Sequence, residues 1–160
     1  MKLSEAKINF LDSLSKGALL TATDIERKSN TMTVSWGGSG ILWGKQVCFL
    51  FVRPERHTYR FLENGSYLSL SFFGSDKKEV LSYCGTKSGR DVDKFKECGL
   101  EFTLENGSAI FKDAVCTIHL KLLYAQDLKE ECFLEKESLK WYQGQGMHKM
   151  YICEILDVKE

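Results

Sequence analysis

The apolar residues of this chain occur in short runs, and the longest of them, residues 47–52, is too short for a helix. That run is rich in strand-forming residues and is followed by Pro54, so it predicts a central β-strand. Further segments combine β-forming residues with the two-residue period of a half-buried strand; they are residues 17–23, 31–36, 67–73, 100–104, 108–112, 114–124 and 149–157. Together they predict a mainly β, mostly antiparallel barrel with a few short helices.

Turn signals separate several of these strands. Glu105-Asn106-Gly107 predicts a hairpin between residues 100–104 and 108–112, because Asn-Gly favours a tight two-residue turn. Gly37-Gly38-Ser39-Gly40 predicts a flexible loop before the apolar run, where the missing side chains would let a flat ligand approach the backbone.

Short helices are expected where capping residues occur. Asp76 and Glu79 have the spacing of a capping box, which predicts a helix that follows them and ends at Gly85. Two more are expected, one over residues 92–98 between Asp91 and Gly99, and one over residues 58–63, where a hairpin at residues 64–65 is the alternative.

Length and charge limit the class of protein. A chain of 160 residues predicts one domain over residues 1–160. Its 22 basic and 22 acidic side chains cancel, which disfavours nucleic acid as a partner because binding phosphates needs a basic surplus. Charges near the first residue argue against a signal peptide, and no apolar run approaches the roughly 20 residues of a membrane span. We therefore expect a cytoplasmic protein without a membrane partner.

Motifs of metal, nucleotide and hydrolytic sites are absent from the sequence. No two of the six cysteines lie within four positions of each other, so we expect mostly buried, reduced thiols and no metal site, while the role of Cys84 stays open. Gly38, Gly40 and Gly44 are spaced one residue too widely for a dinucleotide fingerprint. There is neither a phosphate-binding P-loop nor a G-x-S-x-G elbow.

Polar residues gather in three segments beside aromatic-rich strands. Residues 30–40 carry hydroxyls and Trp36, residues 53–58 carry two arginines, and residues 86–91 carry Lys87 and Arg90 at an expected helix start. Guanidinium groups and backbone amides of these kinds bind phosphate. Taken singly, the segments also fit an edge strand, a solvated loop and a capped linker. Together they favour a small, anionic, aromatic ligand.

Four motifs in order make the sequence similar to a known family. NTMTVSWGG at residues 30–38, FVRPERHT at 51–58, SLSFF at 69–73 and KSGRD at 87–91 closely resemble the flavin reductase-like family, especially its flavoredoxin branch. The resemblance covers most of the chain. It implies an FMN-binding split β-barrel of Greek-key type, usually a homodimer with the flavin at or near the subunit interface.

The resemblance also implies which residues form the site. Those expected to line the flavin are Asn30, Met32, Thr33, Ser35 and Trp36, and those expected near its ribityl-phosphate end are Arg53, Arg56 and Thr58. Others complete the pocket: Ser71, Phe72, Phe73, Lys87, Ser88, Gly89, Arg90 and Asp91. His148 is expected to approach the nicotinamide or flavin, although a rim histidine bonded to the backbone is the alternative.

The implied activity is hydride transfer from NAD(P)H to noncovalently bound flavin, in which the cofactor carries the redox chemistry. An electron carrier of the flavoredoxin type, served by a redox partner protein, is the alternative, and a flavin-free interaction domain is a third reading. The sequence leaves open FMN or FAD, NADH or NADPH, and the electron acceptor.

Overall fold

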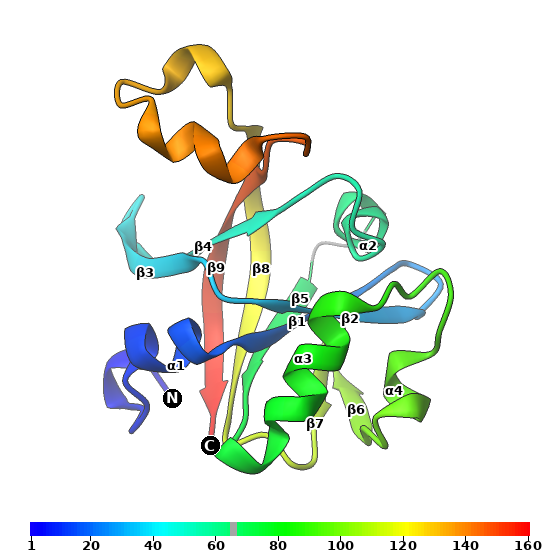
Figure 1. Cartoon of the computed structure of the whole chain (residues 1–160). Helices are drawn as coiled ribbons and strands as arrows, with labels where there is room; N and C mark the ends of the chain where they lie inside the picture. Colours follow the sequence, from blue (N-terminus) through cyan, green and yellow to red (C-terminus); the bar gives the residue numbers. More distant parts are fainter. Residues whose placement is uncertain (65–66) are drawn as a thin grey trace.

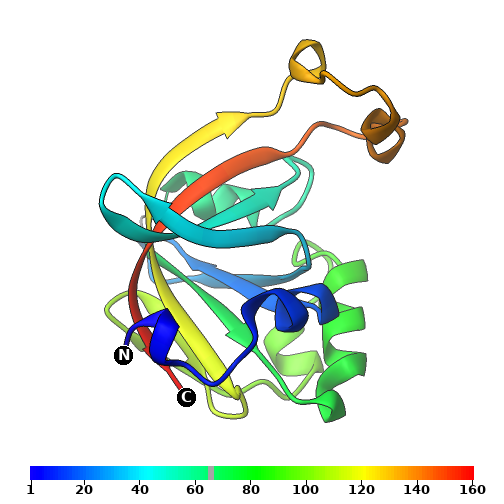
Figure 2. The ribbon, with the colours of Figure 1, turned by 90° about the vertical axis from the view of Figure 1, so that its left-hand side faces the viewer.

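A seven-stranded antiparallel sheet forms the body of the protein (Figure 1). The structure, a computed structural model, describes residues 1–64 and 67–160. The strand order is β2-β1-β5-β8-β9-β4-β3, with bounds Ala18–Thr23 (β1), Ser29–Val34 (β2), Gly37–Leu42 (β3), Lys45–Val52 (β4), Tyr67–Phe72 (β5), Cys116–Asp127 (β8) and Lys149–Lys159 (β9). Figure 2 shows β8 and β9 bending along their length. The predicted mainly β, mostly antiparallel fold with short helices is confirmed.

Strand β4 contains the long apolar run, but it lies beside the edge of the sheet, between β9 and β3, where the sequence predicted a central strand. The central position belongs to β8. Val47, Cys48, Leu50 and Val52 are nevertheless buried, because β4 is paired on both sides and faces the core. An apolar run thus indicates that a strand is buried, and a strand can be buried without lying in the middle of a sheet.

The predicted glycine loop at residues 37–40 is instead the first part of β3, the edge strand that pairs with β4. At Gly37 a Cβ atom would lie 2.4 Å from the carbonyl oxygen of Phe49, and the φ angle is +154°. Glycine is therefore needed here for the close approach of two backbones.

The predicted hairpin forms a second, two-stranded sheet of β6 (Phe102–Glu105) and β7 (Ser108–Phe111). Asn106 and Gly107 have φ angles of 50° and 83°, as a type I′ turn requires. This hairpin packs against β1 and β5.

Short helices lie around the sheet: α1 (Phe10–Lys16), α2 (Tyr59–Asn64), α3 (Lys78–Thr86) and α4 (Lys94–Glu97), with 3-10 turns η1 (Leu3–Glu5), η2 (Ser75–Lys77), η3 (Glu130–Cys132) and η4 (Glu137–Tyr142). The helix expected over residues 58–63 corresponds to α2, while residue 65 of its expected closing turn lies outside the described residues. In the part of the chain that the structure describes, no helix is both long and apolar enough to cross a membrane.

The predicted capping box is wrong, although helix α3 follows as expected. Asp76 falls inside the turn η2, and the N-cap of α3 is Lys77, which makes no side-chain capping bond. Gly85 lies within α3, where a Cβ atom would come 3.3 Å from the Cβ of Thr33. Its role is close packing of α3 on β2, which differs from the predicted helix end.

The N-cap of α4 also differs from the prediction. Asp93, two positions after the expected Asp91, accepts a hydrogen bond from the backbone N–H of Lys96 at 3.2 Å. The helix therefore begins at Lys94, and the predicted Gly99 follows its end with a φ angle of 62°.

Two apolar cores cover opposite faces of the sheet. Leu19 and Leu20 are consecutive in β1 and both fully buried, and each belongs to a different core. The larger core extends across β1, β4, β5, β8 and β9, while the smaller one lies under α3 and the β6–β7 hairpin. All six cysteines are free, and Cys48, Cys84, Cys116 and Cys153 are buried.

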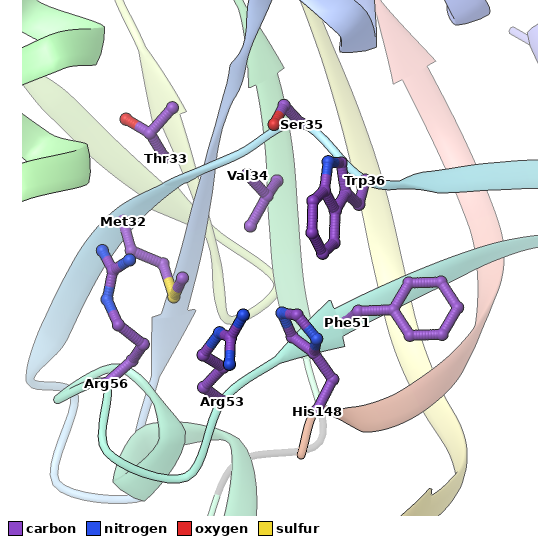
Figure 3. Close-up of a pocket in the computed structure, with 9 residues that line it drawn as sticks. All are labelled: Met32, Thr33, Val34, Ser35, Trp36, Phe51, Arg53, Arg56 and His148. Atoms are coloured by element: carbon purple, nitrogen blue, oxygen red, sulfur yellow. The ribbon is translucent and has the colours of Figure 1, made fainter. Parts of the chain in front are cut away.

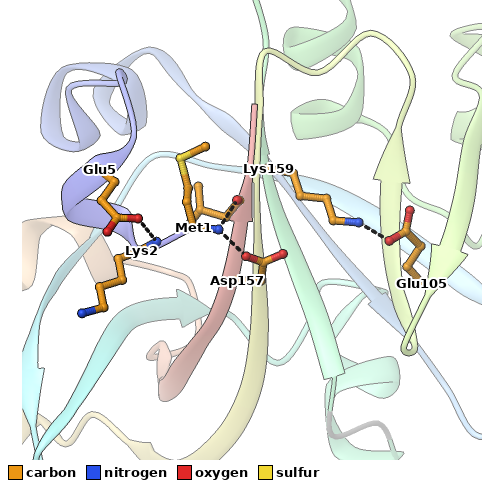
Figure 4. Close-up of polar contacts among 7 residues, drawn as sticks. Met1, Lys2, Glu5, Glu105, Asp157 and Lys159 are labelled. Carbon is orange, nitrogen blue, oxygen red and sulfur yellow. Dashed lines mark hydrogen bonds and ion pairs between the residues drawn. The ribbon is translucent and has the colours of Figure 1, made fainter.

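The start of the chain is tied to the end of β9 (Figure 4). The amine of Met1 donates to Asp157 Oδ1 at 2.5 Å, and the backbone N–H of Val158 donates to the Met1 carbonyl oxygen at 3.1 Å. Next to this pair, Lys159 makes an ion pair with Glu105 of β6. These contacts close the end of the sheet opposite the candidate site.

Residues 129–147, which we call the arm, leave the sheet between β8 and β9 (Figures 1 and 2). The backbone N–H of Leu128 donates to the carbonyl oxygen of His148 at 3.0 Å, so the two strands remain joined at the base of the arm. The arm carries η3 and η4.

Candidate functional site

A hollow of about 160 Å³ lies where β2, β4 and β9 approach each other at one end of the sheet (Figure 3). We call it the first hollow. Its lining residues are Met32, Thr33, Val34, Ser35, Trp36, Phe51, Arg53, Arg56 and His148. The structure therefore brings together two of the predicted polar segments and His148, which is distant from both in sequence. Phe51 and Val34 were not predicted as site residues.

The end of β2 supplies one wall of the first hollow. Met32 and Val34 are buried in the larger core, whereas Thr33 is half-buried and Ser35 is exposed. The hydroxyl of Thr33 donates to the carbonyl oxygen of Leu81 in α3 at 2.5 Å. Met32 and Val34, which alternate along the strand, thus anchor the wall in the core. The hydroxyl oxygens of Thr33 and Ser35 stay available as hydrogen-bond acceptors.

Trp36 gives the first hollow an aromatic wall. Its side chain is 42% exposed and lies edge-to-face with Trp141 of the arm, with ring centroids 5.2 Å apart. The ring of His148 lies 5.3 Å from Trp36 on a tilted plane. A half-exposed indole beside a hollow offers an apolar face to a flat ligand.

His148 is buried and hydrogen-bonded in this wall. Its Nδ1 lies 2.8 Å from the hydroxyl of Tyr142. Burial, and then the charge of Arg53, lower the pKa of His148 to about 4. The imidazole is therefore neutral near pH 7 and carries one N–H donor and one acceptor. The hydrogen-bond partner of the His148 ring is therefore the side chain of Tyr142, whereas the alternative interpretation of the sequence expected a backbone partner.

A second hollow, of about 260 Å³, adjoins the first and shares Arg56 with it. It is lined by Glu55, Arg56, His57, Thr58, Gly85, Thr86, Lys87, Ser88, Arg90 and Lys94. The two predicted segments at residues 53–58 and 86–91 therefore meet here. Four cationic side chains against one carboxylate make this hollow attractive to an anion.

Lys94 was missed by the sequence reasoning. Only 3% of it is exposed, and its ammonium donates to the carbonyl oxygens of Thr31 and Cys84 at 2.8 and 2.9 Å. Burial, and then the nearby charge of Arg56, lower the pKa of Lys94 to about 8. Lysine is usually a surface residue, so no local pattern marks this one.

Asn30, Thr58 and Gly89 form the partition behind the second hollow. The amide of Asn30 donates to the hydroxyl of Thr58 at 2.7 Å, and both residues are buried. A Cβ atom at Gly89 would lie 2.2 Å from Asn30 Oδ1. A third hollow, of about 420 Å³, has Asn30, Gly89 and Asp91 in its lining and shares His57, Arg90 and Lys94 with the second.

Ser71, Phe72 and Phe73 line none of these three hollows. The Ser71 hydroxyl is buried 3.1 Å from that of Thr117, and Phe72 packs edge-to-face on Phe10. Phe73 packs on Phe111 in the smaller core. Strand β5 is an inner strand in which residues 68–72 are buried, so its end serves packing in this structure.

The backbone of Cys84 accepts hydrogen bonds from two cationic residues of the second hollow. The Arg56 guanidinium donates to the Cys84 carbonyl oxygen at 3.5 Å, beside the bond from Lys94. The thiol is buried, and this burial raises its pKa to about 12, so it is not a thiolate nucleophile at neutral pH. Within residues 1–64 and 67–160, no group of three His, Cys, Asp or Glu side chains is arranged to hold a metal ion.

Comparison with solved structures gives several proteins of the same fold. An FMN-binding protein from Thermus thermophilus, solved with bound p-hydroxybenzaldehyde, is 21% identical, with 90% of this chain and 70% of that chain covered and a TM-score of 0.70. Flavoredoxin of Desulfovibrio vulgaris (Miyazaki F) is 21% identical, with 89% and 68% covered and a TM-score of 0.70. The styrene monooxygenase flavin reductase of Pseudomonas putida S12 is 15% identical, with 89% and 77% covered and a TM-score of 0.64.

Sequence comparison completes the assignment. No curated protein sequence matches the chain significantly. The family model described as "Flavin reductase like domain" matches residues 11–160, which include every predicted site residue. This chain therefore belongs to the flavin reductase-like family, as its four motifs predicted.

Proposed function

We propose that this chain binds flavin mononucleotide noncovalently and transfers hydride to it from NAD(P)H. The observation that carries the proposal is the pairing of two hollows that share Arg56, one with an aromatic wall and the other cationic. A flavin has the same two halves, a flat aromatic ring and a terminal phosphate. The names of solved relatives, among them an FMN-binding protein, a flavoredoxin and a flavin reductase, support it.

The second hollow fits a phosphate by its charge. Both acceptors of the Lys94 ammonium in the described part of the chain are neutral carbonyl oxygens, so its buried charge is not compensated there. An ammonium has three N–H donors, which leaves one for a ligand. Arg56, Lys87 and Arg90 add donors around the same space, and Ser88 adds a hydroxyl. An anion in this hollow would balance the charge.

The first hollow fits the ring. Trp36 offers an apolar face, and the hydroxyl oxygens of Thr33 and Ser35 are available to accept hydrogen bonds from a ligand. When bound, the isoalloxazine supplies the redox chemistry, because it accepts hydride from a reduced nicotinamide. His148 stays neutral beside it, so it orients a polar group without adding charge.

A flavoredoxin-type electron carrier is the second candidate. The arm presents Leu134 and Trp141 to solvent, and Trp141 contacts Trp36 of the first hollow. Exposed apolar side chains of this kind suit a redox partner protein. Under this alternative the bound flavin is reduced by a protein donor and reacts slowly with nicotinamides.

The assembly and setting belong to the same proposal. Strand β3 is a free edge of the sheet and carries the exposed Ile41, with exposed Trp43 just after it. A free edge with apolar side chains favours pairing with a second copy, which supports a homodimer. Free thiols at all six cysteines support a reducing compartment such as the cytoplasm. We further propose that residues 1–160 fold as one domain.

Spectroscopy of the purified full chain tests the proposal. Titration with FMN should give saturable binding, and NADH or NADPH added without oxygen should bleach the visible absorbance of the bound flavin. Binding without bleaching would favour the carrier. A colourless protein that fails to bind FMN or FAD would contradict both. Parallel titration with FAD distinguishes the cofactors, because FAD has to place a second nucleotide, for which the third hollow is the adjoining space.

A further inference from the structure

The arm is fastened to the rim of the first hollow by one side chain. Arg53 follows the end of β4, and its guanidinium reaches across to the arm. Its Nη1 donates to the carbonyl oxygen of Gly146 at 2.8 Å, and its Nη2 donates to that of Trp141 at 2.9 Å. Both terminal nitrogens are thus used to hold the last part of the arm.

The same guanidinium also supports an aromatic ring of the arm. The Cζ of Arg53 lies 5.0 Å from the ring centroid of Tyr142, within the range of a cation–π contact. The hydroxyl of Tyr142 lies 2.8 Å from Nδ1 of His148. Arg53, Tyr142 and His148 therefore form a chain of contacts from β4 through the arm to the start of β9.

Two further contacts show that the arm fits this rim closely. The ring of Trp141 meets that of Trp36 edge-to-face. At Gly146 a Cβ atom would lie 3.0 Å from Glu55 Oε2. The arm is therefore seated on Trp36 and Arg53 of the first hollow and on Glu55 of the second.

Arg53 and Arg56, which the sequence placed together at a phosphate, both line the first hollow, but only Arg56 also lines the second. Arg56 and Lys94 lie in the second hollow, whereas Arg53 lines only the first of the three hollows described above. A planar guanidinium can bridge two carbonyl oxygens, while an ammonium is a point donor on a flexible stem. The geometry of Arg53 suits a bridge between backbone groups.

We propose that Arg53 is a positioning residue, whose guanidinium clamps the arm onto the first hollow and, through Tyr142, fixes the ring of His148. The clamp is a property of the flavin-free chain. Its consequence for hydride transfer rests on the proposed function, because only there does His148 face a reacting group.

Hydrogen exchange of the flavin-free full chain tests the clamp directly. In Arg53→Lys, amides in residues 138–147 should exchange about tenfold faster or more, since two charge-assisted bonds lose their fixed geometry. The control Lys136→Ala changes an exposed lysine on the same arm and should leave that exchange unchanged. Equal exchange in Arg53→Lys and the unaltered protein would overturn the proposal.

The link to His148 needs its own readout. We expect NMR titration to give a higher pKa for His148 in Arg53→Lys than in the unaltered protein, because a loosened arm lets water reach the ring. Tyr142→Phe should change the imidazole tautomer equilibrium while the arm stays protected. An unmoved His148 in both variants would refute the link.

Flavin binding separates this inference from the proposed function. Arg56→Lys should bind FMN about tenfold more weakly and leave the exchange of the arm amides unchanged, because Arg56 donates to Cys84 of α3. A large loss in Arg53→Lys with an unchanged arm would mean that Arg53 is a phosphate ligand. If the unaltered protein binds no flavin, the proposed function fails, and the exchange experiment still decides the clamp.

Discussion

The ammonium of Lys94 and the guanidinium of Arg56 both donate to the carbonyl oxygen of Cys84, at 2.9 and 3.5 Å. Like charges placed this close repel each other, and burial adds to the cost. One carbonyl dipole does not offset two cations. The pair is therefore suited to an anion, and it marks where the proposed phosphate would be held.

Replacing Lys94 by methionine should weaken FMN binding by about one to two orders of magnitude, because a charge-assisted hydrogen bond contributes about 1.5 to 3 kcal/mol. Methionine keeps the length and apolar stem of the side chain. Flavin fluorescence titration measures the change. Lys96→Met, an exposed lysine on the same helix, is the matched control and should bind as the unaltered protein does. Equal affinities for the two variants would remove Lys94 from the site.

The ionisation of Lys94 should make flavin affinity fall as the pH rises above about 8, its pKa in the folded protein. A phosphate loses its cationic partner when the amine loses its proton. The fall should be smaller in Lys94→Met. Titrations between pH 7 and 10 check this, and parallel curves for the two proteins would contradict it.

In the flavin-free protein, the contribution of Lys94 to the free energy of unfolding should rise, not fall, as the pH rises above about 8. The folded pKa of Lys94 is about 8 and its ordinary value is 10.5, so between them the unfolded chain binds more protons. The contribution of Lys94 to the free energy of unfolding therefore rises with pH across this window. The difference between the unaltered protein and Lys94→Met, from urea denaturation, isolates this slope.

His148 should make the fold sensitive to mild acid. Its pKa is lowered from 6.5 to about 4, so it contributes stability that is complete above pH 6.5 and is lost as the pH falls toward 4. The slope from one group is at most about 1.4 kcal/mol per pH unit. Denaturation of His148→Gln beside the unaltered protein measures it. If the stability difference between them does not change from pH 7 to pH 4, the neutral, buried state of His148 is disproved.

Gly89→Ala should destabilise the fold by about 1 to 3 kcal/mol, because the added methyl group would overlap Asn30 Oδ1 and break its packing with Thr58. The same change should weaken FMN binding. Gly38→Ala is the control, since a Cβ atom there meets nothing within 4 Å. Thermal unfolding compares the two variants. Similar melting temperatures would show that Asn30 and Thr58 can shift to accommodate the added methyl group without loss of stability.

The fold was largely predictable because its information is local. Strand periods and the Asn106-Gly107 turn are set by neighbouring residues, and the structure has strands and a tight turn at those places. Order within the sheet is not local, so the apolar run of β4 gave no sign that it lies next to the edge. The prediction that Asp76 caps the helix was wrong, because Asp76 lies in the 3-10 turn η2 and helix α3 begins after that turn.

The site was predictable only in part. Residues 32–36 and 53–58 lie next to each other in space as the motifs implied, whereas the end of β5 is covered by packing on both faces. Lys94 could not be foreseen, because its burial depends on the distant Thr31. Nothing in the sequence near Arg53 indicates that its acceptors lie about 90 residues away, on Trp141 and Gly146.

The hydrogen bond between Leu128 and His148 closes the β8–β9 hairpin below the arm and continues the pairing of the two strands to its base. Loop-closure entropy changes only slowly with loop length. A shorter or longer segment between Leu128 and Trp141 therefore costs the fold little loop-closure entropy, while Trp141, Tyr142 and Gly146 keep their contacts with Trp36, His148 and Arg53. The outer part of the arm is thus the place where access to the mouth of the first hollow can diversify while the scaffold beneath it is kept.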